Sequence, residues 1–250
     1  MNELRPVTCN HEAVALEGLV AEPGTPGPHP AVLVMHTALG LGKQMRRQVG
    51  MLAQMGYIAV ATDMYGGGVC HTNPTDAGAA FSQLRNNPQL LRARTVAWHA
   101  LVSGMSNVDP MRVAAIGYCF GGHCVLELAR SGADVKVVVS FHGLLETAMP
   151  AHRGGIKGIV SVYTGAKDPY APEGHVQAFR HEMTAAEARW QVTVFGDAEH
   201  GFTDPDASAM KRPGIAYHEL ADRMSWAGAS TLLETELGNR AAPAGGRFGP

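Results

Sequence analysis

The residues best suited to chemistry centre on a cysteine in a glycine-rich turn. The segment Gly117–Gly122 reads Gly-Tyr-Cys-Phe-Gly-Gly, and it joins an apolar, β-branched run to an amphipathic helical pattern. A strand, a tight turn and a helix in this order form a nucleophile elbow, here with cysteine where serine is usual. The flanking glycines let the strand and the helix approach each other closely. The pattern predicts that Cys119 is a catalytic nucleophile.

The position of Cys119 before a helix favours that chemistry. Unpaired N–H groups and the positive end of the helix dipole stabilise a thiolate and a developing oxyanion. A thiolate attacks far better than a thiol, so an imidazole is needed to take the proton. In open α/β sheets ligands bind outside the carboxyl ends of the strands, and the partners of Cys119 should therefore follow other strands.

Strand patterns alternate with helical patterns along the chain. Continuous apolar runs indicate strands that are buried on both faces. The expected strands are Glu12–Glu22, Ala31–Met35, Tyr57–Thr62, Arg112–Tyr118, Val135–Ser140, Gly158–Tyr163 and Trp190–Phe195. The expected helices are Gln44–Met55, Thr75–Leu84, Gln89–Ser103, the helix after the elbow, Pro172–Ala188 and Pro213–Glu236.

This alternation predicts an α/β fold with a mostly parallel, twisted sheet and helices on both of its faces. No break in composition and no repeat marks a second domain, so residues 1–237 should form a single domain. Residues 238–250 are rich in Ala, Gly and Pro, and we expect them to form a flexible tail.

Three residues after expected strands form an ordered set. Cys119, Asp168 and His200 follow one another as nucleophile, acid and histidine, which is the chain order of the triad in α/β-hydrolases. His200 would take the proton of the thiol, and Asp168 would orient the imidazole. The backbone N–H groups of Phe120 and Ala38 would bind the oxyanion of the tetrahedral intermediate.

Other candidates fit the pattern less well. Asp197 lies too close to His200 in the chain to be its acid, and three other histidines after Asp168 fall within helical stretches: His175, His181 and His218. We expect Asp63 to accept hydrogen bonds in its own turn and Cys124 to be a packed core thiol. A redox pair of Cys119 and Cys124 would have poor disulfide geometry.

Composition excludes several classes of function. The 250 residues carry 20 basic and 22 acidic side chains, so neither nucleic acid nor an anionic membrane surface is an expected partner. No apolar run approaches the roughly 20 residues of a membrane helix, and the first ten residues lack the apolar core of a signal peptide. The four cysteines are scattered without metal-ligand spacing. We expect a cytoplasmic protein, monomer or dimer, with free thiols and no bound metal.

The elbow, Asp168 after a strand, and His200–Phe202 before a long final helix resemble the dienelactone hydrolases (carboxymethylenebutenolidases) of the α/β-hydrolase superfamily. The segments Thr62–Gly66 and Phe141–Gly143 are also similar to that family, and the resemblance covers residues 12–237. It implies hydrolysis of a lactone or small carboxylic ester through a Cys-His-Asp triad and an acyl-thioester. It further implies no metal or organic cofactor, no large cap domain, and a pocket for a small substrate. Residues that could line this pocket are His36, Thr37, Tyr65, His142 and Phe202.

One position departs from the family pattern. Thr37 stands where the family carries a glutamate that helps to activate the cysteine, and threonine cannot accept a proton from a thiol. Arg85, Arg92 and Arg94 are candidates for holding a substrate carboxylate, although a solvated helix face explains them equally well. A general carboxylesterase or thioesterase, and a non-catalytic ligand-binding protein of the same fold, remain alternatives.

Overall fold

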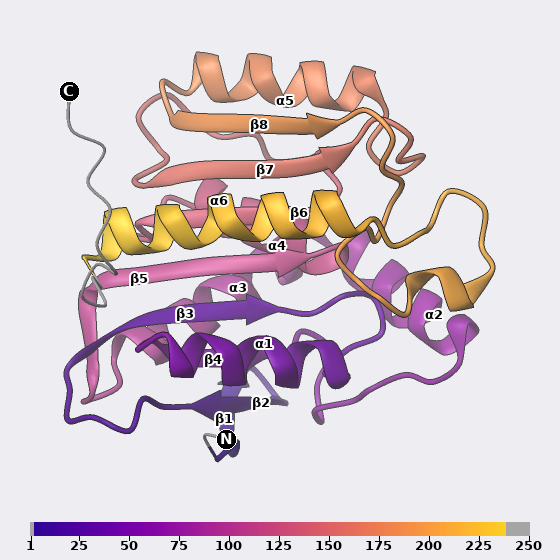
Figure 1. The fold of residues 1–250 in the computed structure, drawn as a ribbon. Coiled ribbons are helices and arrows are strands. Elements are labelled where there is room, and N and C mark those ends of the chain that lie inside the picture. Colours follow the sequence, from indigo (N-terminus) through magenta and orange to yellow (C-terminus); the bar gives the residue numbers. More distant parts are fainter. Residues whose placement is uncertain (1–2, 239–250) are drawn as a thin grey trace.

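The computed structural model describes residues 3–238, so the expected tail beyond Gly238 lies outside the described residues. Eight strands form one sheet in the order β1-β2-β4-β3-β5-β6-β7-β8 (Figure 1). Strands β4, β3, β5, β6, β7 and β8 run parallel, whereas β2 pairs antiparallel with both β1 and β4. The predicted fold class, an α/β protein with a mostly parallel sheet, is confirmed.

The strands are β1 (Arg5–His11), β2 (Val14–Ala21), β3 (His29–Met35), β4 (Ile58–Thr62), β5 (Val108–Tyr118), β6 (Val137–Phe141), β7 (Ile159–Gly165) and β8 (Arg189–Phe195). The helices are α1 (Lys43–Gln54), α2 (Pro74–Arg85), α3 (Pro88–Ser103), α4 (Phe120–Arg130), α5 (Glu173–Ala185) and α6 (Glu219–Leu237), with a 3₁₀ turn, η1, at Ala207–Met210.

Helices cover both faces of the sheet (Figure 1). Helices α2, α3, α4 and α5 bury their apolar side chains in one core, which includes Trp98, Phe120 and Phe179. Helices α1 and α6 pack on the opposite face, where Leu52 and Leu233 are fully buried. The central strands β3 and β4 are buried along nearly their whole length, as their continuous apolar runs predict.

Two elements differ from the expectation. The first strand was expected at Glu12–Glu22, but the chain forms a hairpin of β1 and β2. Strand β1 lies at the edge of the sheet with mostly exposed side chains, so it lacks the apolar pattern that marks the central strands. The last helix begins at Glu219 rather than near Pro213, because Gly214 has a φ of +79° and Ile215 bridges to His200.

The elbow requires very close approach between backbones. A Cβ atom on Gly121 would lie 2.0 Å from the carbonyl oxygen of Met35, and one on Gly117 would lie 2.0 Å from the carbonyl oxygen of Gly121. The start of α4 therefore rests directly on the ends of β3 and β5. This contact brings the cysteine at the elbow close to the loop after β3.

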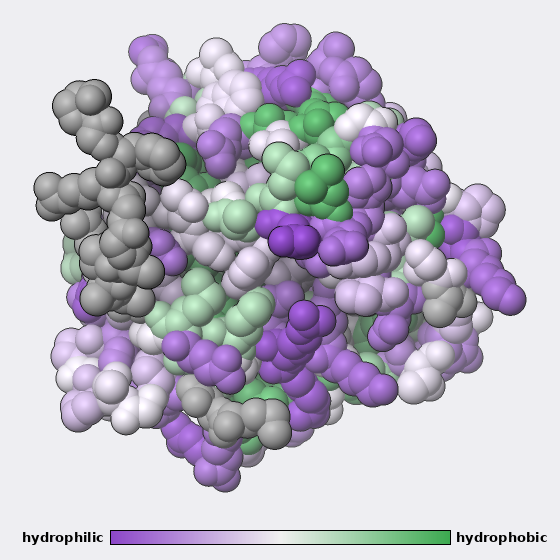
Figure 2. All heavy atoms as spheres, viewed as in Figure 1, coloured by the Kyte–Doolittle hydropathy of each residue, from purple (hydrophilic) through white to green (hydrophobic). Residues whose placement is uncertain are grey.

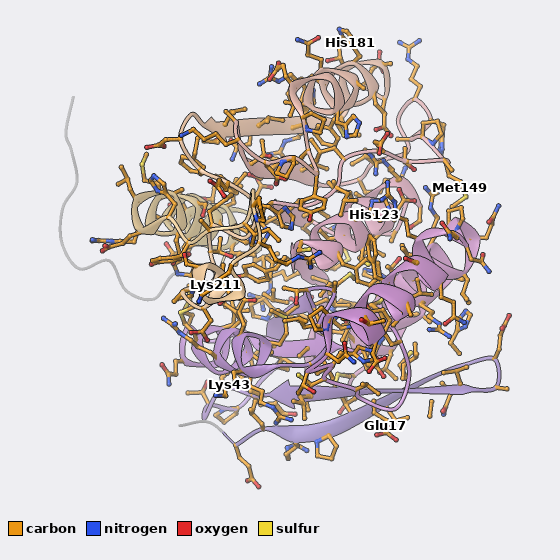
Figure 3. The ribbon with its side chains drawn as sticks, turned by 90° about the vertical axis from the view of Figure 1, so that its right-hand side faces the viewer. Glu17, Lys43, His123, Met149, His181 and Lys211 are labelled. Atoms are coloured by element: carbon orange, nitrogen blue, oxygen red, sulfur yellow. The ribbon has the colours of Figure 1, made fainter. Side chains whose placement is uncertain are left out.

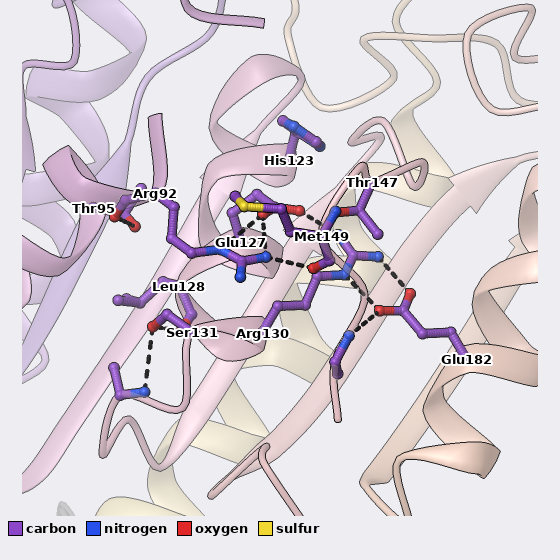
Figure 4. Close-up of polar contacts among 12 residues, drawn as sticks. Arg92, Thr95, His123, Glu127, Leu128, Arg130, Ser131, Thr147, Met149 and Glu182 are labelled. Atoms are coloured by element: carbon purple, nitrogen blue, oxygen red, sulfur yellow. Dashed lines mark hydrogen bonds and ion pairs between the residues drawn. The ribbon is translucent and has the colours of Figure 1, made fainter. Parts of the chain in front are cut away.

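A buried ionic network fixes the segment between β6 and β7 (Figure 4). Glu127 on α4 pairs with Arg92 at 2.6 Å and with Arg130 at 3.0 Å, and Arg130 also pairs with Glu182 at 2.8 Å. The same arginines donate to the carbonyl oxygens of Met149 and Leu145. Charges that are both paired and hydrogen-bonded in this way are tolerated in a protein interior.

Within residues 3–238, no helix combines the length and the apolar character needed to cross a membrane.

The close packing of the elbow yields a stability prediction. Gly121→Ala should lower the free energy of unfolding by about 1–3 kcal/mol or more, because the added methyl group overlaps the backbone of Met35. Gly50→Ala in α1 is the matched control, since its methyl group meets no atom within 4 Å. That control should be stabilising by about 0.5–1 kcal/mol. Urea unfolding measures both values, and equal stabilities for the two variants would contradict this account of the elbow.

Candidate active site

Cys119 sits between β5 and α4 in a backbone conformation that few residues adopt. Its φ is +54° and its ψ is −113°. The conformation is held from both sides, because the Cys119 N–H donates to the Phe141 carbonyl at 3.0 Å and the Cys119 carbonyl accepts from the His123 N–H at 3.2 Å. A non-glycine residue held at positive φ stores strain, which the surrounding packing must offset.

The structure brings Cys119, His200 and Asp168 together from three strand ends. His200 Nδ1 donates to Asp168 Oδ2 at 2.8 Å. The His200 side chain also forms a hydrogen bond with the Cys119 sulfur. Asp168 is 2% exposed, and its second carboxylate oxygen accepts the N–H of Tyr170 at 2.8 Å. The carboxylate is therefore fixed by its own loop while it orients the imidazole.

The electrostatics favour a charge-separated pair. Burial alone would raise the pKa of the Cys119 thiol, but the charge of His200 and hydrogen bonds to the sulfur lower it below its ordinary value. Burial likewise opposes protonation of His200, yet the Cys119 thiolate and Asp168 together raise its pKa to about 10. The two shifts have one cause, since each group stabilises the charged form of the other.

Two backbone N–H groups, those of Ala38 and Phe120, also donate to the Cys119 sulfur. Side chains hold the Ala38 segment in place. His36 Nδ1 donates at 2.6 Å to the carbonyl oxygen of Thr37, which belongs to the same peptide group as the Ala38 N–H. Tyr65 donates its hydroxyl to the Ala38 carbonyl at 3.1 Å, and its ring stacks on Phe120 at 5.6 Å. His36 and Tyr65 thus support the two donors from behind.

Two rings pack against His200. The ring centroid of Tyr170 lies 4.7 Å from that of His200, and the ring centroid of His142 lies 5.1 Å away. Burial and the charge of His200 hold the pKa of His142 well below its ordinary value, so His142 is neutral. Its Nε2 lies 2.8 Å from the Thr203 hydroxyl. These contacts restrict the movement of the His200 ring.

A cavity of about 410 Å³ opens onto Cys119 and His200. Most of its wall is apolar and comes from α2, the loop after β3 and the segment after His200, with Phe81, Leu144 and Ile215 among its members. Two arginines, Arg85 and Arg212, stand on the same wall. Figure 3 looks onto the carboxyl ends of the strands, with Lys43 and Lys211 on one side and His123 and Met149 on the other.

The residues expected from the sequence divide into two groups. Cys119, His200, Thr37, Ala38 and His142 line the cavity. His36, Tyr65, Phe120, Asp168 and Phe202 are not part of its lining and lie behind it. The Thr37 hydroxyl already has a partner in its own loop, since it accepts a hydrogen bond from the Leu39 N–H at 3.3 Å.

The expected arginine candidates separate in the same way. Arg92 binds Glu127, and Arg94 donates to the carbonyl oxygens of Met64 and Tyr65, so neither faces the cavity. The suggestion that these two hold a substrate carboxylate is wrong, because both point away from the cavity into contacts with Glu127 and with backbone carbonyl oxygens. Arg85 lines the cavity, where it pairs with Glu146 at 3.3 Å at an exposed site.

Sequence reasoning missed Tyr170 and Arg212. Tyr170 stands two residues after Asp168 in the same loop, so a search of that loop could have found it. Arg212 follows η1 in an irregular segment, where no strand end or helical period points to the cavity. Asp63, in contrast, behaves as expected, accepting backbone N–H bonds from Tyr65 and Gly68 in its own turn at 2.8 and 2.9 Å.

In the part of the chain that the structure describes, no three His, Cys, Asp or Glu side chains gather as they would around a metal ion.

Known proteins resemble this chain over nearly its whole length. Residues 16–237 match the model of the dienelactone hydrolase family. A protein of Synechocystis sp. named "Putative carboxymethylenebutenolidase" is 27% identical over 92% of this chain and 96% of its own.

Two solved structures, each 32% identical, cover 94% of this chain and 98% of their own. One is named "m3DLH", with a TM-score of 0.88. The other is a dienelactone hydrolase-like promiscuous phosphotriesterase from metagenomic libraries, with a TM-score of 0.87. This chain belongs to the dienelactone hydrolase family and is a hydrolase that acts on esters or lactones.

Proposed function

We propose that this protein cleaves a lactone or small carboxylic ester through Cys119, His200 and Asp168, with an acyl-thioester intermediate. The observation that carries the proposal is the hydrogen-bonded chain from the Cys119 sulfur through His200 to Asp168, with the N–H groups of Ala38 and Phe120 directed at the sulfur. The free cysteines suit a reducing compartment, and we place the enzyme in the cytoplasm.

In the first half-reaction the Cys119 thiolate attacks the carbonyl carbon, and negative charge moves from sulfur to the carbonyl oxygen. The N–H groups of Ala38 and Phe120 stand beside the sulfur, so they can pass from the thiolate to that oxygen. The His200 imidazolium gives its proton to the leaving alkoxide as the C–O bond breaks. In a lactone the alcohol stays attached to the acyl group.

In the second half-reaction water hydrolyses the thioester. His200 is now neutral and takes a proton from the water, whose oxygen attacks the thioester carbonyl. The C–S bond breaks, the thiolate returns, and the acid leaves. Asp168 keeps the His200 Nδ1–H in place throughout, so Nε2 always faces the reacting atoms.

The cavity indicates which esters fit. Its apolar wall suits a small hydrophobic acyl or alkoxy group, and Arg85 and Arg212 can bind a carboxylate carried elsewhere on the substrate. We propose an ester or lactone that bears a second, anionic group. The general carboxylesterase or thioesterase alternative predicts instead that neutral substrates react equally well.

A phosphotriester is a second candidate substrate. A structural relative 32% identical to this chain is named a promiscuous phosphotriesterase. The backbone N–H groups of Ala38 and Phe120 would donate to a phosphoryl oxygen as readily as to a carbonyl oxygen. A neutral phosphotriester therefore belongs in the assay panel beside the carboxylic esters.

Removing the nucleophile or the base should abolish hydrolysis. Cys119→Ala and His200→Ala should each lower kcat/KM for a chromogenic short-chain ester at least about a hundredfold, because each removes a group that acts in the transition state. Cys124→Ala, which removes a buried thiol outside the cavity lining, is the matched control and should retain activity. Wild-type rates in both active-site variants would contradict the triad.

Alkylation of Cys119 should show its lowered pKa. The rate of reaction with iodoacetamide, followed by mass spectrometry, should reach half its maximum at a lower pH than the rate of an unperturbed thiol, because the pKa of Cys119 is lowered. In His200→Ala burial is no longer opposed by the imidazolium, so the midpoint should rise by about one unit or more. Alkylation of the exposed Cys70 is the internal reference and should not change.

The alkaline limb of hydrolysis follows from the raised pKa of His200. The acid form gives a proton to the leaving group, so kcat/KM should hold through neutral pH and fall only near pH 10. A profile that falls between pH 6 and 8 would contradict the ion pair.

The two cavity arginines should recognise an anionic substrate. Arg212→Gln and Arg85→Gln should each raise KM about tenfold or more for an ester that carries a carboxylate, since a hydrogen bond to a charged group contributes about 1.5–3 kcal/mol. The matched control is the same ester with a carboxamide in place of the carboxylate, whose KM should change little. Equal effects on both substrates would exclude carboxylate recognition.

A further inference from the structure

A second cavity lies beside the catalytic one and has no part in the reaction described above. Its volume is about 550 Å³, and it lies among α1, α6 and the loop at residues 203–206. Gln44 and Asp204 line both cavities, so only these side chains and their neighbours separate the two. On the face formed by α1 and α6, Figure 2 shows strongly hydrophilic and apolar surface side by side.

The inner surface of this second cavity is aromatic. Tyr118 and Phe141 stack with ring centroids 4.8 Å apart and planes 7° from parallel, and Trp226 and Met51 complete the apolar surface. These residues come from the ends of β5 and β6 and from α6 and α1. A flat or branched apolar group of a ligand could pack against them.

Two buried polar groups near this surface have no hydrogen-bond partner among the described residues. They are the hydroxyl of Tyr118, a residue that is 1% exposed, and the amide oxygen of Gln48 on α1. Tyr118 and Gln48 both line the cavity. An unsatisfied buried polar group costs about 1–3 kcal/mol, so a ligand that bonded to either of them would recover part of that cost.

The charges of the cavity are separated by element. Lys43 and Arg47 stand one turn apart on α1, and within residues 3–238 neither forms an ion pair. Carboxylates stand on the other walls, with Asp204 in the loop and Asp222 on α6. Burial raises the pKa of both carboxyl groups. At Asp222 the Tyr217 hydroxyl, which donates to it at 3.2 Å, and the charge of Arg47 act in the opposite direction. The cavity thus has a positive wall on α1 and carboxylates on the facing elements. A further cation in its lining, Arg223 on α6, is mostly exposed and pairs with Glu219 at 3.6 Å.

We propose that this cavity binds a small zwitterion with an apolar body, namely an α-amino acid with an apolar side chain. The ligand carboxylate would lie toward Lys43 and Arg47, its ammonium group toward Asp204 and Asp222, and its side chain against the stacked rings. A ligand with only one of the two charges would pair with only one of these two sets of protein charges, and we therefore expect it to bind more weakly.

A ligand in this cavity would touch the support of the catalytic histidine. Thr203 lines the cavity, and its hydroxyl lies 2.8 Å from Nε2 of His142, whose ring packs on His200. Gln44 donates to the same hydroxyl at 3.5 Å. The site is therefore placed to sense or alter the position of His200 without entering the catalytic cavity.

Calorimetric titration of the full chain with L-phenylalanine tests the proposal. The Cys119→Ala variant is used, so the outcome does not depend on hydrolysis. We expect saturable binding to one site. Phenylacetate, which lacks the ammonium group, and phenethylamine, which lacks the carboxylate, should each bind at least tenfold more weakly. Absence of binding at about 10 mM ligand, where a site with a dissociation constant of about 1 mM would be largely filled, or equal binding of the single-charge analogues, would overturn the proposal.

Paired variants place the ligand within the cavity. Arg47→Gln should weaken L-phenylalanine binding at least tenfold, whereas Arg46→Gln, the neighbouring exposed residue outside the lining, should leave it unchanged. Asp222→Asn keeps the side-chain shape and should weaken L-phenylalanine but not phenylacetate. Phe81→Ala alters only the catalytic cavity. If this variant lost binding while Arg47→Gln kept it, the ligand would lie in the catalytic cavity, and the inference would be overturned.

Discussion

The contact between Cys119 and His200 is the interaction on which the rest of the site depends. Burial disfavours a charge on either side chain, and further partners oppose that effect. The sulfur has two backbone N–H donors, and the His200 ring has the carboxylate of Asp168. Every one of these partners follows a different strand, and the parallel sheet is what aligns the strand ends. The catalytic site therefore depends on the order and direction of the strands in the sheet.

Loops at those strand ends are held by buried polar groups. Asp63 collects backbone N–H groups in the turn after β4, and the network around Glu127 holds the segment after β6. Both are costly to bury and would be destabilising if one partner were removed. Their effect is to fix irregular backbone that no ladder of strand or helix hydrogen bonds can fix. Rigid loops keep the donors and the imidazole in place before a substrate arrives, as preorganised electrostatic stabilisation requires.

The sequence predicted most of the fold, because apolar runs and helical periods are strong signals in a sheet that is buried on both faces. The edge strand β1 was not predicted, since an exposed edge needs few apolar residues. Cys119, Asp168 and His200 could be found because they directly follow strands. Arg212 could not, because its segment reaches the cavity only through the fold of an irregular loop. That Thr37 departs from the family pattern stays a prediction, and the hydrogen bond that its carbonyl oxygen accepts from His36 was visible only in three dimensions.

The donors that face the sulfur belong to the main chain, and this has a consequence for how such a site can change over evolutionary time. A substitution at Ala38 or Phe120 leaves the N–H group in place, so neither position can lose its donor by mutation to any residue except proline. Adjustment must instead come through side chains that hold the peptides from behind, as His36 does through the Thr37 carbonyl and Tyr65 through the Ala38 carbonyl. Variation at these two positions offers a route by which relatives could tune reactivity while keeping the same nucleophile, base and acid.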